Sequence, residues 1–307
     1  MNFNNYLFRA HSIGNIMTGI PKPLTERQSQ TFKDLEDRHE KHIGKALTEK
    51  QLLTFLQLKE KKNAKCKLSD GAKTFLDKLI WQELTGRSNK INSKYLDKGL
   101  MTEEKSITLL SEVEGKLFIK NKERKTNEFF QGECDNAQKK IRDVKSSFEF
   151  ETFPIAKKEI ESKLYVWQLE VYMDLWEMNE SELIYCLNDT PFKLIDDELR
   201  RLDWKSNIFD LTGNIREESI DLVVETIMNH IYTFQGLEDY CDFNDNIQIK
   251  WFEDKFKEIP VELRIKKYKL TQDKLRNSQL KEMVSLARDY MNSQLEALGD
   301  AIIDLKK

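Results

Sequence analysis

Apolar residues recur at helical spacing in two long stretches of the middle of this chain. The segment that opens at Gly99 has apolar residues three to four apart and predicts a helix, and residues 160–178 repeat this pattern. In the second segment Gln168 and Tyr172 are four residues apart and share one helix face. A buried glutamine needs a hydrogen-bond partner, so this face is predicted to meet another polar group.

The first part of the chain predicts a helical hairpin and a third helix. Thr25 and Thr48 each precede a glutamine by three residues, the spacing of a capping box, and helices are expected at about 26–44 and 49–63. A third helix is expected from the cap at Ser69 to Leu84. Beyond Thr190 the chain is again charged and helical in pattern, with amphipathic stretches at 217–233 and 277–305.

Two short alternating stretches flank a polar turn at 136–140 and predict a β-hairpin. With the turn centred near Lys139, Asp135 and Asp143 face each other across the strand pair, with Cβ atoms roughly 5 Å apart. Lys145 lies two residues after Asp143 and points to the same face. Two carboxylates and an ammonium group therefore converge.

Like charges at this distance disfavour each other's ionisation unless a cation lies between them. Oxygen ligands suit Mg²⁺ or Mn²⁺, which bridge to phosphates. Upstream, Glu103 and Glu104 lie in the first turn of the helix predicted after Gly99, where the helix dipole favours carboxylates. The alternative is that these are surface acids in a chain of which 34% of the residues are charged.

The order of these features resembles a known pattern. The ordered set is Gly99 with Glu103, Gly132 with Asp135, Asp143-Val144-Lys145, and Gln168 with Tyr172. It resembles the core of the PD-(D/E)XK nuclease superfamily and, more narrowly, the phage lambda exonuclease and YqaJ-like viral recombinase family. The resemblance covers roughly residues 6–190. Cys134 stands where that family has a proline, and Asp143 where it often has glutamate, but neither change removes a ligand oxygen.

The resemblance implies an α/β (α+β) fold with a restriction-endonuclease-like core, in which helices flank a mixed central sheet. The whole chain, 1–307, would be a single nuclease domain. Residues 20–90 would form a helical insertion, 95–190 the catalytic core and 191–307 a helical C-terminal extension.

The resemblance also implies roles for the metal-site residues. Asp135 would bridge two Mg²⁺ ions, with Mn²⁺ as a substitute. Asp143 and the carbonyl group of Val144 would complete one site, and Glu103 would help to hold the other. Family spacing favours Glu103, although Glu104 stays an alternative.

Other residues would act on water and substrate. Lys145 would orient or deprotonate the attacking water, and Gln168 and Tyr172 would fix Lys145 and the scissile phosphate. Arg9 and Ser12, in a segment that looks like the family's N-terminus, would hold a terminal phosphate.

The implied activity is Mg²⁺-dependent hydrolysis of linear double-stranded DNA from the 5′ end, in phage-type homologous recombination. The partners would be duplex DNA ends, a single-strand annealing protein and further copies of the chain, as a trimer. A structure-specific or restriction-type endonuclease, and a non-catalytic DNA-binding or assembly protein, stay open as alternatives.

Charge and cysteine content change this picture little. The net charge is −3, but residues 1–98 carry +8 and the remainder −11, so the leading third is basic. This is compatible with DNA contact and equally with a solvated helical surface. The four cysteines have no paired spacing, which disfavours disulfide and zinc frameworks. There is no apolar run of membrane length and no signal-peptide pattern, so a cytoplasmic protein is expected, in the bacterial host if phage-encoded.

Overall fold

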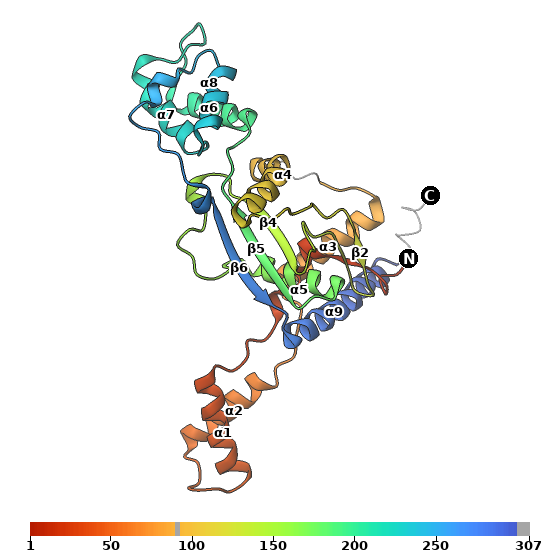
Figure 1. Cartoon of the computed structure of the whole chain (residues 1–307). Helices are drawn as coiled ribbons and strands as arrows, with labels where there is room; N and C mark the ends of the chain where they lie inside the picture. Colours follow the sequence, from red (N-terminus) through yellow and green to blue (C-terminus); the bar gives the residue numbers. More distant parts are fainter. Residues whose placement is uncertain (90–92, 300–307) are drawn as a thin grey trace. The chain divides into compact units, whose positions relative to one another are not determined.

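The computed structural model describes residues 1–89 and 93–299 (Figure 1). The chain divides into two compact units. Among the described residues, the first unit consists of Met1–Phe8, Ser12–Arg87 and residues 274–299. The second consists of Arg9–His11 and Ser88–Asp273. The predicted site residues after position 88 therefore all belong to the second unit.

The first unit is helical. Its helices are α1 (Glu26–Glu40), α2 (Glu49–Lys62), α3 (Asp70–Thr85) and α9 (Lys274–Leu298). Two short 3-10 turns precede them, η1 (Ala10–Asn15, of which residues from Ser12 on belong to this unit) and η2 (Met17–Gly19). The part of the predicted helix at 277–305 that lies beyond residue 299 is outside the described residues.

Both predicted capping boxes are present in the helical hairpin. The Thr25 hydroxyl accepts a hydrogen bond from the Gln28 N–H, and the Thr48 hydroxyl accepts one from the Gln51 N–H. Each glutamine side chain accepts the reciprocal bond from the threonine N–H. The two helices bury a small core of their own, whose members are Phe32, Leu35, Phe55 and Leu58.

The pair α3 and α9 forms the rest of the first unit. The Ser69 hydroxyl caps α3 as predicted, and the helix ends at Gly86, whose φ of 64° is left-handed. The helix α9 packs against α3, and the Tyr290 hydroxyl donates to Asp77 Oδ1 at 2.9 Å. The Arg288 guanidinium ties the N-terminal segment to α9 by donating to the Tyr6 carbonyl oxygen at 2.9 Å.

The second unit combines strands and helices. Its strands are β1 (Phe8–Arg9, of which Arg9 belongs to this unit), β2 (Lys125–Thr126), β3 (Phe130–Gly132), β4 (Ile141–Ser146), β5 (Glu180–Cys186) and β6 (Ile265–Thr271). Its helices are α4 (Lys94–Glu114), α5 (Lys163–Trp176), α6 (Phe192–Ser206), α7 (Ile220–Met228) and α8 (Phe234–Phe243). Short 3-10 turns are η3 (Phe150–Thr152), η4 (Glu217–Ser219), η5 (Ile249–Phe252) and η6 (Val261–Arg264).

The central sheet is mixed, as predicted. Its strand order is β4-β5-β6, with β4 and β5 parallel and β5 and β6 antiparallel. The third strand corrects one expectation, because β6 lies in the part of the chain that was expected to be a purely helical extension. The smaller sheet, of order β1-β3-β2, is separate.

The predicted hairpin at 128–145 is shorter than expected. Its two arms belong to different sheets, and a single antiparallel bridge, between Asn136 and Arg142, joins them. This bridge has the predicted register, so Asp135 is the next residue opposite Asp143. The arms diverge beyond it because β3 pairs with β2 and β4 pairs with β5.

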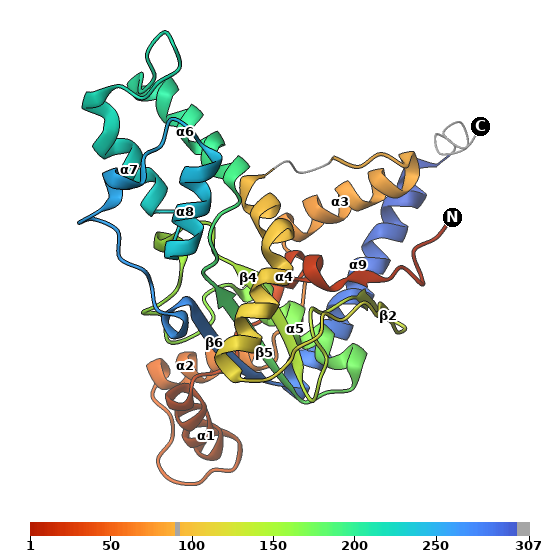
Figure 2. The same ribbon diagram turned by 45° about the horizontal axis from the view of Figure 1, so that its top comes forward.

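Successive side chains of β4 point alternately to the two faces of the sheet. One face is covered by α4 and the other by α5 (Figure 2). Val144 packs with apolar residues of α4, and Ser146 bonds to the same helix. Asp143 and Lys145 point to the other face and contact residues of α5. Asp143 and Lys145 therefore lie between β4 and α5.

The remaining helices α6, α7 and α8 enclose a second apolar core, to which Ile195, Val223, Ile227 and Tyr240 belong. All four cysteines are free. Within the described parts of the chain, no helix is both long and apolar enough to cross a bilayer.

Candidate functional site

A pocket of about 470 Å³ in the second unit brings together three of the six predicted catalytic residues and the predicted metal ligand Val144. Glu103 reaches it from α4, Asp135 from the segment after β3, and Val144 and Lys145 from β4. The exposed side chains of Tyr95 and Leu100 form part of its wall. Side chains distant in sequence therefore share one opening.

Asp143 lies beneath this pocket and is almost fully buried. Its Oδ2 lies 2.6 Å from Lys145 Nζ in an ion pair. The Gln168 amide donates to Asp143 Oδ1 at 3.3 Å and contacts the Tyr172 hydroxyl at 3.1 Å. The polar partner that a buried Gln168 was predicted to need is thus the Asp143 carboxylate. Lys145 is held by its ion pair with Asp143 and by the Tyr165 ring, whose centroid is 5.3 Å from Nζ.

Asp135 is bound to β4 through the backbone. Its Oδ2 accepts a hydrogen bond from the Val144 N–H at 2.5 Å, and its peptide carbonyl accepts one from Asn121 at 2.7 Å. Burial and the nearby charge of Asp143 raise the pKa of Asp135. Burial alone would lower the pKa of Lys145, but the carboxylates of Asp143 and Asp135 outweigh it and raise that pKa.

The upstream acid at the pocket is Glu103. Glu104, the alternative, is exposed and lines a different depression on α4. Glu103 Oε2 lies 2.8 Å from Lys120 Nζ. The sequence pattern did not single out Lys120, because it lies in a lysine-rich loop in which nothing distinguishes it from Lys116 or Lys122.

Polar residues behind the pocket join α4 to the sheet. The Thr102 hydroxyl donates to Ser146 Oγ at 2.8 Å, and the hydroxyls of Ser106 and Ser146 lie 2.8 Å apart. The Asn188 amide donates to Ser106 Oγ at 2.6 Å. This chain of bonds fixes the helix that carries Glu103 relative to the strand that carries Lys145.

Lys98, the residue before Gly99, is fully buried in the same region and has no predicted role. Its ammonium donates to the Phe148 carbonyl oxygen and to Thr190 Oγ1, each at 2.8 Å. Burial lowers the pKa of Lys98 to about 7, against the smaller effects of Asp189 and Glu149. No sequence signal separates this lysine from the exposed lysines of the chain.

Position 132, the first residue of the Gly132-Asp135 pair, requires glycine for a steric reason. A Cβ atom at Gly132 would lie 2.8 Å from Tyr172 Cε1 and 2.9 Å from Ala10 Cβ. Only glycine therefore lets the end of β3 approach the helix that carries Gln168 and Tyr172.

The two predicted phosphate-binding residues fall into different units. Arg9 is exposed and belongs to the second unit, whereas Ser12 lies in η1 in the first. Burial, followed by the charges of Arg9 and Lys145, lowers the pKa of His11. Arg9 and Lys145 thus both act electrostatically on the same histidine.

The donors at this pocket fit a hard divalent cation. Glu103 and Asp135 offer carboxylate oxygens and Val144 a carbonyl oxygen from the lining, the donor type that Mg²⁺ prefers, and the Asp143 carboxylate adjoins them through its ion pair with Lys145. Within residues 1–89 and 93–299, however, no three acidic, histidine or cysteine side chains are gathered in positions ready for one ion. Two of the three acids are instead engaged by lysine ammonium groups.

Comparison with known proteins gives a structural likeness only. No family model matches the chain, and no curated protein matches it. The crystal structure of a phage-related exonuclease from Haemophilus somnus 129PT matches with a TM-score of 0.58 and 20% identity, over 96% of this chain and 97% of that one.

A weaker likeness is to the alkaline exonuclease LHK-Exo from Laribacter hongkongensis. Its TM-score is 0.44 and its identity 12%, over 77% of this chain and 88% of that one. The mixed sheet, the flanking helices and the nearly complete overlap with the first structure agree with the predicted fold, a mixed central sheet flanked by helices. The chain therefore has the fold of the phage-related exonuclease from Haemophilus somnus.

Proposed function

We propose that this chain is a metal-dependent deoxyribonuclease and, more narrowly, an exonuclease that acts on linear double-stranded DNA. The observation that carries the proposal is the convergence of Glu103, Asp135, Val144 and Lys145 on one pocket, with Asp143 paired to Lys145 beneath it. The likeness to a phage-related exonuclease over almost the whole chain supports the same conclusion.

The acidic residues would hold two Mg²⁺ ions, with Mn²⁺ as a substitute. Asp135 would bridge them, Asp143 and the Val144 carbonyl would complete one site, and Glu103 would contribute to the other. The ions, when bound, supply charge stabilisation to the attacking and leaving oxygens of a displacement at phosphorus.

The other residues of the pocket have roles that follow from their contacts. Lys145 reaches the opening and would position the attacking water and stabilise charge on the phosphate. Gln168 contacts Asp143 and Tyr172, so it would hold the carboxylate in place as a positioning residue. Arg9 and Ser12 would hold the terminal phosphate of the substrate.

The biological setting is part of the same proposal. The enzyme would digest from the 5′ end and leave a single strand for an annealing protein in phage-type recombination, in the bacterial cytoplasm. A trimer would be its assembly.

Digestion of end-labelled linear duplexes, with and without a 5′ phosphate, tests the proposal in Mg²⁺ and in chelator. Replacing a residue that only supports a metal ligand costs about 10- to 100-fold. Asp135 is proposed as a ligand and Lys145 as a group that acts on water and phosphate, so Asp135→Asn and Lys145→Met should each reduce nucleotide release by about 100-fold or more. Each variant should keep its circular dichroism spectrum. Full activity in either variant would show that the assigned site is wrong.

Two controls sharpen this experiment. Glu104→Gln changes a carboxylate beside Glu103 that lies outside the pocket, and it should leave the rate unchanged where Glu103→Gln lowers it. Closed circular DNA should stay intact, since an exonuclease needs an end. Cutting of the circle would instead identify an endonuclease.

A further inference from the structure

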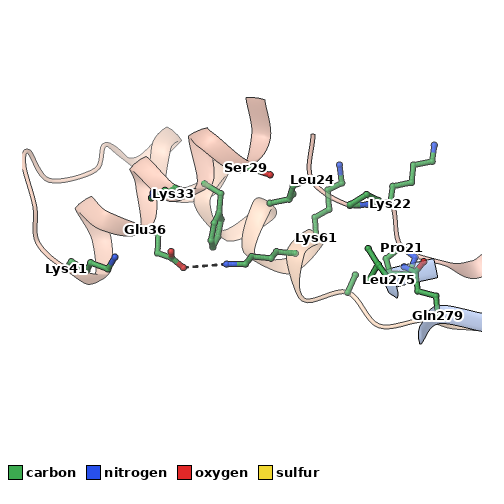
Figure 3. Close-up of a pocket in the computed structure, with 14 residues that line it drawn as sticks. Pro21, Lys22, Leu24, Ser29, Lys33, Glu36, Lys41, Lys61, Leu275 and Gln279 are labelled. Carbon is green, nitrogen blue, oxygen red and sulfur yellow. Dashed lines mark ion pairs between the residues drawn. The ribbon is translucent and has the colours of Figure 1, made fainter. Parts of the chain in front are cut away.

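A second pocket lies in the first unit and has no role in the proposed hydrolysis. Its volume is about 590 Å³, and it lies between the segment 21–24, α1, the end of α2 and the start of α9 (Figure 3). The charged side chains that line it are Lys22, Lys33, Glu36, Lys41, Lys61 and Lys62. Five cations and one anion therefore surround a single concavity.

Local ion pairs compensate part of this charge. Glu36, the acid in the lining, lies 3.9 Å from Lys62 Nζ. Lys41, which lines the pocket, has its Nζ 2.7 Å from Asp37 Oδ1, outside the lining. The single anion of the lining is thus already engaged, and two of the five lysines have carboxylate partners.

Three lysines of the lining keep an unpaired charge. Among the described residues, no carboxylate lies within ion-pair distance of Lys22, Lys33 or Lys61. Lys61 instead donates to the neutral amide of Gln28 at 2.7 Å, while Lys22 and Lys33 extend into solvent. Like charges around one concavity repel one another, so an anion that enters it is favoured.

The surrounding segment has the same sign. Residues 21–67 contain twelve Lys and Arg against seven Asp and Glu, in a chain whose net charge is −3. The pocket also has apolar walls, at Leu24 and Phe32. A polymer with repeated phosphates, and with apolar sugar faces between them, matches both the lysine ammonium groups and the apolar walls of this pocket.

We propose that this pocket is a contact site for the phosphate backbone of duplex DNA, formed by the α1–α2 hairpin and the start of α9. The inference rests on the proposed function, because it takes the substrate to be DNA. It adds a binding site for the backbone that is separate in sequence from the catalytic residues.

The test is the salt dependence of duplex binding, which reports phosphate contacts. Each contact contributes about 0.9 to the slope of log K against log salt for B-DNA. The variant Lys22→Gln/Lys33→Gln/Lys61→Gln should therefore reduce the slope by about 3 and weaken binding at 0.1 M salt by roughly tenfold or more. Fluorescence anisotropy of a labelled duplex in chelator measures this without turnover.

A matched control separates local contact from loss of overall charge. Lys45→Gln/Lys50→Gln/Lys78→Gln removes three exposed lysines of the same unit that do not line the pocket. It should change the slope by less than 1. An equal effect of the two triple variants, or no effect of the first, would overturn the inference.

The two proposals fail in different ways. If the unmodified protein releases no nucleotides from linear duplexes in Mg²⁺, the proposed function is wrong. If it digests DNA and the Lys22/Lys33/Lys61 variant binds duplexes as tightly as the unmodified protein, with the same salt slope, the catalytic proposal stands and the backbone site is wrong. Circular dichroism should confirm that the glutamine variant keeps its helices.

Discussion

Lys98→Met should change the pH dependence of stability in a defined direction. In the folded protein burial lowers the pKa of Lys98 from 10.5 to about 7, whereas the unfolded chain restores an ordinary lysine. Between these two values the unfolded state binds a proton that the folded state has released. Stability therefore rises with pH through this window in the unmodified protein, and methionine removes that contribution.

The magnitude follows from the size of the shift. One pKa unit corresponds to about 1.4 kcal/mol, so the free energy of unfolding gained between pH 7 and pH 9 is about 2 to 3 kcal/mol. Below pH 6.5 the ammonium is charged in both states, and the difference between protein and variant should be flat. His230, whose pKa is lowered to about 4 chiefly by burial, stays neutral throughout the window.

The assay is urea unfolding followed by tryptophan fluorescence at several pH values from 6 to 9, with protein and variant in parallel. Taking the difference between them cancels the titration of all other groups. Lys94→Met is the control, because Lys94 is on the same helix but partly exposed and ion-paired with Glu198 at 3.0 Å. A difference between the unmodified protein and Lys98→Met that does not vary with pH would refute the argument that Lys98 is a desolvated cation.

Three further variants test local features. Gly132→Ala should cost about 1 to 3 kcal/mol and slow digestion, because the new methyl group displaces Tyr172. Lys120→Gln should lower the Mn²⁺ concentration needed for half-occupancy by roughly tenfold, since it removes a positive charge beside Glu103; spin resonance of Mn²⁺ measures this without DNA. Thr48→Ala should destabilise the α1–α2 hairpin by about 1 kcal/mol, visible as faster amide exchange in α2.

Each of these expectations can be contradicted by a specific result. Weaker Mn²⁺ binding in Lys120→Gln would mean that the lysine orients Glu103 rather than competing with the ion. Thr54→Ala, within α2, is the control for the cap, because the Thr54 hydroxyl donates to the Lys50 carbonyl oxygen of the preceding turn and not to an N–H group at the helix start. Unchanged stability in Gly132→Ala would show that Tyr172 can move aside.

Local sequence patterns predicted the features that depend on neighbours along the chain. The threonine-glutamine pairs gave both caps of the hairpin, and the two-residue spacing of Asp143 and Lys145 gave their shared face. The register of Asp135 opposite Asp143 also followed from the turn, although the strand pair around it is only one bridge long.

Features that depend on distant partners were not visible in the sequence. β6 has three lysines and an irregular apolar pattern, and it forms a strand because its backbone pairs with the free edge of β5. Lys98 and Lys120 look like solvated lysines until the fold places one among aromatic rings and the other against Glu103. The roles assigned to single positions stay predictions, and they came from the order of the motifs because residue spacing alone was not specific enough.

The sheet order has a consequence for how the protein is made. β5 ends at Cys186 and its second neighbour, β6, begins at Ile265, so about 80 residues must leave the ribosome before the sheet is complete. At about 5 to 20 residues per second this delay is of the order of 4 to 16 seconds, with an apolar strand edge unpaired. The intervening helices α6 to α8 have a core of their own and can fold during that interval. By bringing the ends of the segment together early, they would shorten the time during which nascent chains can associate through β5.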